Sequence, residues 1–347
     1  MRNVPIQNVY YMLAYAWKNT KEKDITPSSG EESPELYNFL SKKLVDGIYH
    51  LLKRGFNRDY RMLSNDIRTI RGKINFSETM KRGLLYNGKV QCEYDEFDED
   101  TKQNQIIKAT LTKLPSIDSL EKNIKDEITV IKRRFLKVSN IELVKSSFSG
   151  LSFNGNNKYY QYLINICEFI YQNIIPTEES GKYKFKKFDE ERLFAIFELF
   201  VKNFYIHERP DLIVHGEQYS YQMVADRAEA QSYLPTLNTD VSLISKERKL
   251  IIDTKFYSKT LETNEFGNKK INSNNLRQIN AYLDNATIED GQKLDGMLLH
   301  PTIDEEYDEV FKYQGKFNVF FQTINLNQDW KAIKEKLLQI IEPIGQA

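Results

Sequence analysis

Three ionisable residues, Asp240, Asp253 and Lys255, recur around a segment whose sequence predicts a β-hairpin. Two apolar, β-branched runs flank the charged residues 246–249, which is the pattern of two antiparallel strands joined by a short loop. A turn centred between Lys246 and Glu247 places Asp240 opposite Asp253, and directly opposed residues point the same way with Cβ atoms about 5 Å apart. Period-two alternation puts Lys255 on the same face, roughly 7 Å further along. Two carboxylates and one ammonium therefore converge.

This constellation favours metal-dependent phosphodiester hydrolysis. Two carboxylates at such a distance can share Mg²⁺, an oxygen-seeking ion that keeps several waters and can also hold a substrate phosphate. The ammonium of Lys255 can then lower the pKa of an attacking water or stabilise charge on a phosphoryl oxygen. The alternative is a surface hairpin with solvated or ion-paired charges, the commoner case for an isolated D-x-K tripeptide. The apolar residues 250–252 favour the interpretation as a catalytic site, because they place the D-x-K residues at the end of a central strand.

The hairpin is expected to lie within a C-terminal α/β core. Its register pairs Val241 with Ile252 and Leu243 with Leu250. An amphipathic helix is predicted before the hairpin at residues 190–207. After it, the predicted elements are a helix at 274–283, strands at 294–300 and 317–324, and a helix at 330–341. On the helix at 274–283, Gln278 and Tyr282 share one face because they are four residues apart.

These residues resemble the PD-(D/E)xK nuclease superfamily, because Asp240 followed by Asp253-Thr254-Lys255 at a strand end matches its catalytic motif. Over nearly the full length the chain is similar to the McrC family, the nuclease subunits of McrBC modification-dependent restriction systems. The similar segments are residues 5–17 (PIQNVYYMLAYAW), 71–74 (RGKI), 104–108 (NQIIK) and 274–283 (NNLRQINAYL). Thr239 replaces the superfamily's proline, and Asp253 stands where Glu is commoner. Neither departure removes a ligand.

The resemblance implies roles for five residues. Asp240 and Asp253 would ligate Mg²⁺, and Lys255 would assist the attacking water. The superfamily often carries a glutamate on its first helix that points at the metal, which makes Glu198 a third candidate ligand. A partly exposed helix glutamate is an equal alternative for Glu198. The helix that packs behind the catalytic strands brings its glutamine, here Gln278, near the lysine.

The resemblance also implies partners. In the McrC family the N-terminal half docks on McrB, an AAA+ motor. We therefore expect this chain to be the endonuclease subunit of a GTP-dependent restriction complex specific for modified cytosine. It would cut DNA and stimulate the GTPase of an McrB-like oligomer. That partner would read the methylated sites. No G-x-x-x-x-G-K-[ST] phosphate loop occurs, so this chain itself should bind no nucleotide. Two alternatives stay open: a catalytically inactive adaptor that activates the GTPase, and a freestanding DNA nuclease.

Composition bounds the class of protein. The 347 residues include 49 basic and 49 acidic ones, and this zero net charge argues against DNA binding by an overall positive field. Balanced charge favours dependence on a partner. Cys92 and Cys167 form no C-x-x-C pattern, which fits a reducing cytoplasm. Since neither a signal peptide nor a long apolar run is found, we expect no secretion and no membrane insertion.

Two domains are expected. Residues 1–180 would form an α+β domain that docks on the AAA+ GTPase, and residues 188–347 the endonuclease domain, with a polar linker at 176–187. The amphipathic helix near the N-terminus is expected to pack within the first domain. The fold class is therefore α/β, an α+β domain followed by a restriction-endonuclease-like core with a central mixed sheet.

Overall fold

The computed structural model describes residues 4–18, 36–153, 157–176, 183–185, 190–255, 260–263 and 268–341. The chain folds into two compact units. One, called here the sheet unit, combines residues 1–31 with residues 188–347, and the other, the helical unit, comprises residues 32–187. The sheet unit is therefore built from two stretches that are separated in the sequence by the whole helical unit.

The sheet unit is built on a mixed six-stranded sheet in the order β14-β15-β13-β10-β9-β6. Strands β10, β13 and β15 run parallel, whereas β6, β9 and β14 pair antiparallel with their neighbours. The elements in chain order are α1 (Ile6–Ala16), α7 (Glu190–Glu208), β6 (Ile213–His215), β7 (Gln218–Ser220), β8 (Thr236–Asn238), β9 (Val241–Ile244), β10 (Arg248–Thr254), β11 (Glu262–Thr263), β12 (Lys269–Lys270), α8 (Ser273–Asn285), β13 (Lys293–Thr302), β14 (Asp308–Tyr313), β15 (Phe317–Asn325) and α9 (Trp330–Gln339). This arrangement confirms the predicted α/β core with a central mixed sheet.

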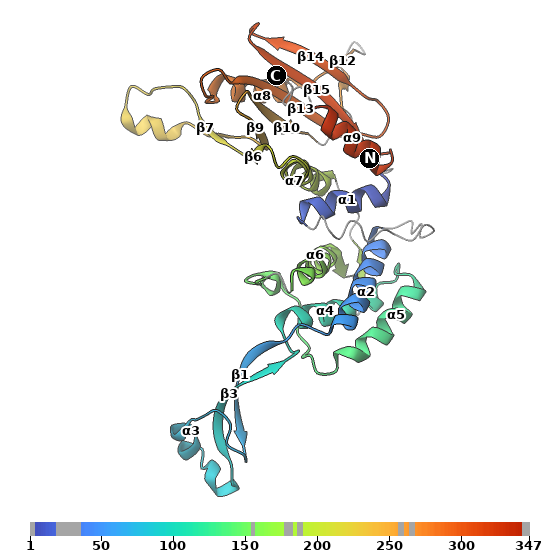
Figure 1. Ribbon diagram of the computed structural model, residues 1–347, viewed down its shortest axis with the longest axis vertical. Helices are drawn as coiled ribbons and strands as arrows, with labels where there is room; N and C mark the ends of the chain where they lie inside the picture. Colours follow the sequence, from blue (N-terminus) through green and yellow to red (C-terminus); the bar gives the residue numbers. More distant parts are fainter. Residues whose placement is uncertain are drawn as a thin grey trace. The chain divides into compact units, whose positions relative to one another are not determined.

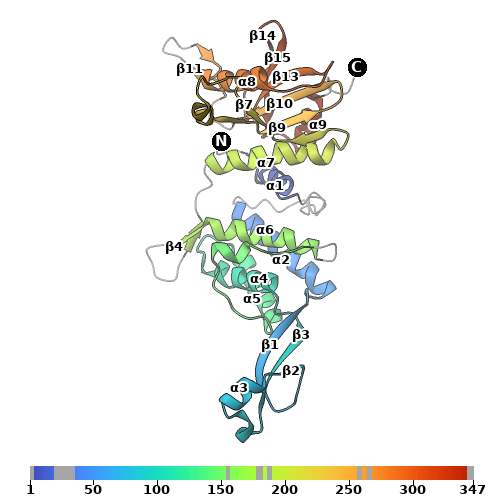
Figure 2. The ribbon, with the colours of Figure 1, turned by 90° about the vertical axis from the view of Figure 1, so that its left-hand side faces the viewer.

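Helix α8 covers one side of this sheet, and α7 lies on the other (Figure 2). The apolar stripe of α8 packs on Ile251, Leu298 and Phe321, which come from the three parallel strands. All seven residues of β10 are buried, because neighbouring strands pair with both of its edges and helices cover it. A strand in that position needs apolar side chains on both faces, which explains its Leu-Ile-Ile run.

Helix α1 belongs to the sheet unit, so the predicted domain of residues 1–180 is wrong at its N-terminal end. The side-chain amide of Asn8 donates hydrogen bonds to the carbonyl oxygens of Leu326 (2.9 Å) and Gln328 (2.7 Å). Tyr11 stacks on Trp330 with ring centroids 4.6 Å apart. The helix is amphipathic as predicted, and its apolar face packs within the sheet unit: Tyr15 contacts the rings of Phe200 on α7 and Trp330 on α9.

The helical unit consists of packed helices and a projecting antiparallel ribbon (Figure 1). Its helices and strands are α2 (Leu36–Arg54), β1 (Asp59–Ile67), β2 (Lys73–Ile74), α3 (Phe76–Lys81), β3 (Val90–Asp98), α4 (Lys102–Lys113), α5 (Lys122–Lys132), α6 (Lys158–Asn173), β4 (Ile174–Pro176) and β5 (Tyr183–Phe185). The predicted linker at residues 176–187 lies mostly outside the described residues.

Residues 59–98 of the helical unit form what we call the arm. In it β1 and β3 pair over nine residues each, and the chain between these two strands forms β2 and α3. Arg61 fixes the arm at its base, since its guanidinium pairs with Asp100 at 2.7 Å and with Asp98 at 3.1 Å. Asp100 in turn accepts hydrogen bonds from Ser139, which is part of the helical body. The arm leaves several large apolar side chains exposed, among them Met62, Phe76, Met80 and Tyr86.

Candidate active site

The hairpin of β9 and β10 has the register that its sequence predicts. Val241 pairs with Ile252 and Leu243 with Leu250. Asp240 directly precedes β9, and Lys255 directly follows β10, so the three residues of the motif meet at one end of the hairpin. On the other edge of β10, the amide of Lys255 donates to the carbonyl oxygen of Leu299, which extends the parallel ladder with β13 by one bond (2.9 Å).

A chain of contacts fixes Lys255 in place. Its ammonium lies 2.8 Å from Oδ2 of Asp253 and donates a hydrogen bond to Oε1 of Gln278 at 3.0 Å. The amide nitrogen of Gln278 donates to the hydroxyl of Tyr282 (2.7 Å), which donates to the carbonyl oxygen of Asn238 (2.6 Å). Helix α8 thus orients Gln278 through Tyr282 and orients the lysine through Gln278, because residues four apart share a helix face.

Asp240 is held by the neighbouring strand. Both the backbone amide and the hydroxyl of Thr254 donate to Oδ2 of Asp240, each at 2.8 Å. The segment leading to Asp240 is fixed as well, because Thr239 exchanges backbone and side-chain hydrogen bonds with Glu217 (2.9 and 2.8 Å). Thr239 therefore makes contacts that the proline usual in the superfamily could not make, since proline has neither an N–H nor a hydroxyl.

Asp253 is the most strongly perturbed carboxyl group of the site. It is fully buried, and burial raises its pKa to about 7; the negative charges of Asp240 and Glu198 act in the same direction, while Lys255 opposes them. Despite its ion pair with Lys255, neither oxygen of Asp253 accepts a well-formed hydrogen bond from any described residue. A buried carboxylate with unused acceptor capacity is costly unless a cation compensates it.

Glu198 reaches the same site from α7. Burial raises its pKa, and the charge of Asp240 adds to that effect, whereas Lys202 and Lys255 lower it. The charge of Asp240 acts on Glu198 and on Asp253, so the three predicted carboxylates lie in one cluster. A raised pKa on a partly buried glutamate beside two aspartates agrees better with a site residue than with a solvated surface glutamate.

The donor set suits Mg²⁺ better than an ion that needs a closed protein cage. Within the described residues, no group of three or more Asp, Glu, His or Cys side chains is gathered tightly enough to form such a cage. Mg²⁺ usually binds through one or two carboxylates, retained waters and substrate phosphate. Asp240 and the orphaned oxygens of Asp253 fit that role, with Glu198 as the outer acidic neighbour.

Three residues beside the site carried no assigned role in the sequence. Thr254, the middle residue of the motif, donates a hydrogen bond to Asp240. Tyr282 accepts a hydrogen bond from Gln278, and the helix face that these two residues share could have predicted this contact. His300 is buried on β13 next to Lys255, and burial together with the charge of Lys255 lowers its pKa to about 3. This imidazole therefore stays neutral beside the ammonium.

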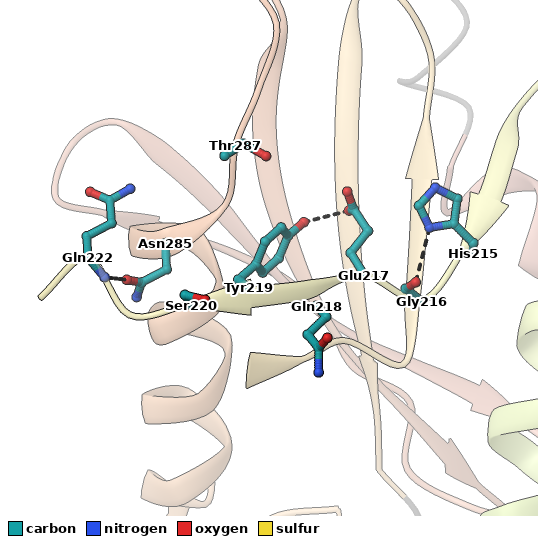
Figure 3. A pocket seen from close by; sticks show the side chains of 9 residues that line it. All are labelled: His215, Gly216, Glu217, Gln218, Tyr219, Ser220, Gln222, Asn285 and Thr287. Carbon is teal, nitrogen blue, oxygen red and sulfur yellow. Dashed lines mark hydrogen bonds between the residues drawn. The ribbon is translucent and has the colours of Figure 1, made fainter. Parts of the chain in front are cut away.

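A polar cavity of about 530 Å³ lies next to the segment that precedes the site (Figure 3). Its lining residues are His215, Gly216, Glu217, Gln218, Tyr219, Ser220, Gln222, Asn285 and Thr287. Burial acts to raise the pKa of Glu217, but hydrogen bonds from Tyr219 and Lys249 outweigh it and hold that pKa below its usual value. The cavity includes none of the five predicted site residues.

No helix in the described ranges is both long and apolar enough to span a membrane.

Comparison with known proteins relates the chain to one family. A family model described as "McrBC 5-methylcytosine restriction system component" matches residues 6–301. The "Type IV methyl-directed restriction enzyme EcoKMcrBC" of Escherichia coli strain K12 is 32% identical over 343 residues, which are 98% of this chain and 97% of the relative.

A solved structure shares the fold. It is a refined half-complex from a tetradecameric assembly of Thermococcus gammatolerans McrB AAA+ hexamers with bound McrC, and it aligns with a TM-score of 0.60 at 16% identity. The alignment covers 97% of this chain and 76% of the other. At that identity the match supports the fold, while the matches in sequence establish the kinship. The chain belongs to the McrBC 5-methylcytosine restriction system component family, as its resemblance to McrC predicts.

Proposed function

We propose that the chain is the endonuclease subunit of a modification-dependent restriction complex and hydrolyses DNA phosphodiester bonds with Mg²⁺. The observation that carries this proposal is the environment of Asp253, a fully buried carboxylate without an accepted hydrogen bond, beside Asp240 and 2.8 Å from Lys255. A decayed site would have no reason to keep so costly a group in the core. The intact cluster therefore favours catalysis over a purely adaptor role.

Asp240 and Asp253 would hold the metal, which when bound acts as a Lewis acid and activates water. Thr254 fixes one oxygen of Asp240 by two hydrogen bonds and leaves the other free to ligate. Burial raises the pKa of Asp253 to about 7, so a metal ion that favours the charged carboxylate would displace the proton from the fraction of this group that is protonated near neutral pH. Ligand formation is thus coupled to proton release in the neutral range.

Lys255 is proposed to orient the attacking water and stabilise the charge that grows on the phosphoryl oxygen. Lys255 donates one N–H group to Gln278 and forms an ion pair with Asp253, and an ammonium has three N–H groups, so it keeps donors for the reacting atoms. Gln278 cannot ionise, so its contact positions the ammonium without changing the charge of the site. Tyr282 keeps Gln278 in the orientation that presents its oxygen to the lysine.

We further infer that the chain acts together with an McrB-like AAA+ GTPase and stimulates its GTP hydrolysis. The similar solved assembly consists of McrB AAA+ hexamers with bound McrC. In this chain the arm supplies a candidate contact surface, because Met62 is 73% exposed, Phe76 69% and Tyr86 97%. Large apolar side chains gathered in one exposed element are typical of a protein interface.

Methylated DNA is the proposed substrate, and the partner is proposed to read the methylated sites. The curated relative is described as methyl-directed. This chain has 49 basic and 49 acidic residues, so it lacks the positive excess with which a DNA-reading protein usually binds the backbone. Delegating recognition to the partner would leave the sheet unit with positioning and hydrolysis of the scissile phosphate.

The test is a cleavage assay with the chain, its cognate AAA+ GTPase, GTP and Mg²⁺ on methylated and unmethylated plasmids. The native chain should cut only the methylated plasmid. Asp253→Asn should abolish cutting while GTP hydrolysis remains stimulated, because that change touches only the sheet unit. Tyr86→Ser in the arm should reduce both GTPase stimulation and cutting.

Each proposal has its own contradictory outcome. Equal cutting by Asp253→Asn would place the chemistry elsewhere. GTPase stimulation without any cutting by the native chain would favour the adaptor. Cutting that needs neither GTP nor the GTPase would favour a freestanding nuclease, and native behaviour of Tyr86→Ser would remove the arm from the interface.

A further inference from the structure

Helix α7 brings a second lysine to the candidate site. Lys202 lies one turn after Glu198, and residues four apart share a helix face. Burial and the charge of Asp240 raise the pKa of Glu198, and the charges of Lys202 and Lys255 lower it. Lys202 therefore lies within electrostatic range of the acidic cluster, on a different element from Lys255.

The backbone at Gly216 locates the ammonium of Lys202. A Cβ placed on Gly216 would lie 2.8 Å from the carbonyl oxygen of Thr239, 3.4 Å from that of Asp240 and 3.7 Å from Nζ of Lys202. Only a residue without a side chain lets these segments approach so closely. The ammonium is thereby placed beside the main chain that carries Asp240, next to the proposed metal ligands.

Lys202 has hydrogen-bonding capacity to spare. Lys249 and Lys255, the other lysines of this region, each have two partners among the described residues. Lys202 forms neither a hydrogen bond nor an ion pair with any residue of the described ranges, even with Glu198 one turn away, although its side chain is partly buried. A partly desolvated ammonium without a partner is a site for an anion.

We propose that Lys202 binds a non-bridging oxygen of a DNA backbone phosphate adjacent to the phosphate on which Lys255 acts. The inference rests on the proposed nuclease function and adds a substrate-binding residue to it. A lysine suits this task because its compact charge binds phosphate without demanding one geometry. Phosphate contacts of this kind fix the register of the strand in the site rather than read its sequence.

The test compares Lys202→Met, Lys202→Arg and a matched control, Lys312→Met, all in the full chain assembled with its GTPase. Lys312 is an exposed lysine on β14, which β15 and β13 separate from β10. DNA affinity is measured at several salt concentrations in an Asp253→Asn background, which keeps the DNA intact. Lys202→Met should weaken binding about tenfold and lower the slope of log Kd against log salt by about one.

The cleavage-competent chain gives a second readout. Lys202→Met should raise KM for DNA about tenfold and change kcat much less, because a contact present in both ground and transition states affects binding alone. Lys202→Arg should behave as the native chain, because it keeps the charge. GTPase stimulation and the unfolding midpoint should not change, which separates lost phosphate binding from misfolding.

An unchanged salt slope in Lys202→Met, or an equal loss in Lys312→Met, would overturn the assignment of Lys202. Failure of Lys202→Arg to restore affinity would do the same, since any cation of similar reach should serve. These outcomes differ from failure of the proposed function. If Asp253→Asn cuts like the native chain, the nuclease site itself is wrong whatever Lys202 does.

Discussion

In the metal-free sheet unit, the stability of the Asp253→Asn variant relative to the native chain is expected to rise with pH. In the folded chain burial raises the pKa of Asp253 from 3.8 to about 7. Between those two values the folded state binds more protons at this position than the unfolded state does. Its contribution to the free energy of unfolding therefore falls as pH rises from about 4 to 7, and stays at its lowest value above that window.

This rise in the pKa of Asp253 corresponds to about 4 kcal/mol of stability lost at pH 8, of which roughly 2 kcal/mol is already lost at pH 5.5. Asparagine carries no charge and escapes this cost. It also buries an amide in place of the carboxyl group, an effect that does not change with pH, while the attraction of Lys255 for the charged form is already contained in the pKa of about 7. The change with pH, about 2 kcal/mol in favour of the variant, is thus the quantity to measure.

Urea unfolding followed by tryptophan fluorescence suits this measurement. The two tryptophans, Trp17 and Trp330, both belong to the sheet unit, so the signal reports the unit that contains the substitution. Native chain and variant would be compared from pH 5.5 to 8.5 with a chelator present. Asp290→Asn, a change at an exposed turn residue, is the control and should show no pH-dependent difference.

A second arm adds Mg²⁺. The metal should stabilise the native chain, more at pH 8 than at pH 5.5, and should not stabilise Asp253→Asn, because binding to the folded state alone raises its stability. A variant that is less stable than the native chain by the same amount at every pH would refute the reasoning. So would equal stabilisation of both proteins by Mg²⁺.

Three further substitutions test the supporting contacts. Thr254→Val should raise the Mg²⁺ concentration for half-maximal cutting about tenfold, whereas Thr254→Ser keeps the hydroxyl and should not; equal metal titrations would refute the clamp on Asp240. Gln278→Leu should lower kcat by about 10–100-fold without changing GTPase stimulation, and native turnover would remove Gln278 from the site. Asn8→Ala should lower the free energy of unfolding of the sheet unit by about 1–3 kcal/mol in urea, and an unchanged midpoint would show that α1 is dispensable.

The register of the hairpin could be predicted because it is local. A charged turn and period-two alternation fix how Val241 meets Ile252, and no distant residue is needed for that pairing. The convergence of Asp240, Asp253 and Lys255 follows from the same register. Gln278 came from the resemblance, and the structure brings it within 3.0 Å of Lys255.

Other contacts depend on residues far apart in the sequence. Nothing in the sequence around Thr254 shows that its hydroxyl turns toward Asp240 at the end of the strand. In the sequence, Gly216 indicates no more than a turn or a close approach of the backbone. The structure shows which approach it is, since a Cβ at this position would collide with the carbonyl oxygen of Thr239. Strand β14 carries no buried alternation to reveal it, because it lies on the edge of the sheet with most of its side chains exposed.

The split construction of the sheet unit has a consequence for how the chain is made. Helix α1 is synthesised first, but its partners on α7 and α9 follow only after the helical unit. At a synthesis rate of about 5–20 residues per second, roughly 10–40 s pass between the synthesis of α1 and that of α7, and during this time the apolar face of α1 is not yet buried. The helical unit can complete its own fold in that interval. Chaperone demand during synthesis should therefore centre on the first helix, and a chain released before α7 emerges would expose it.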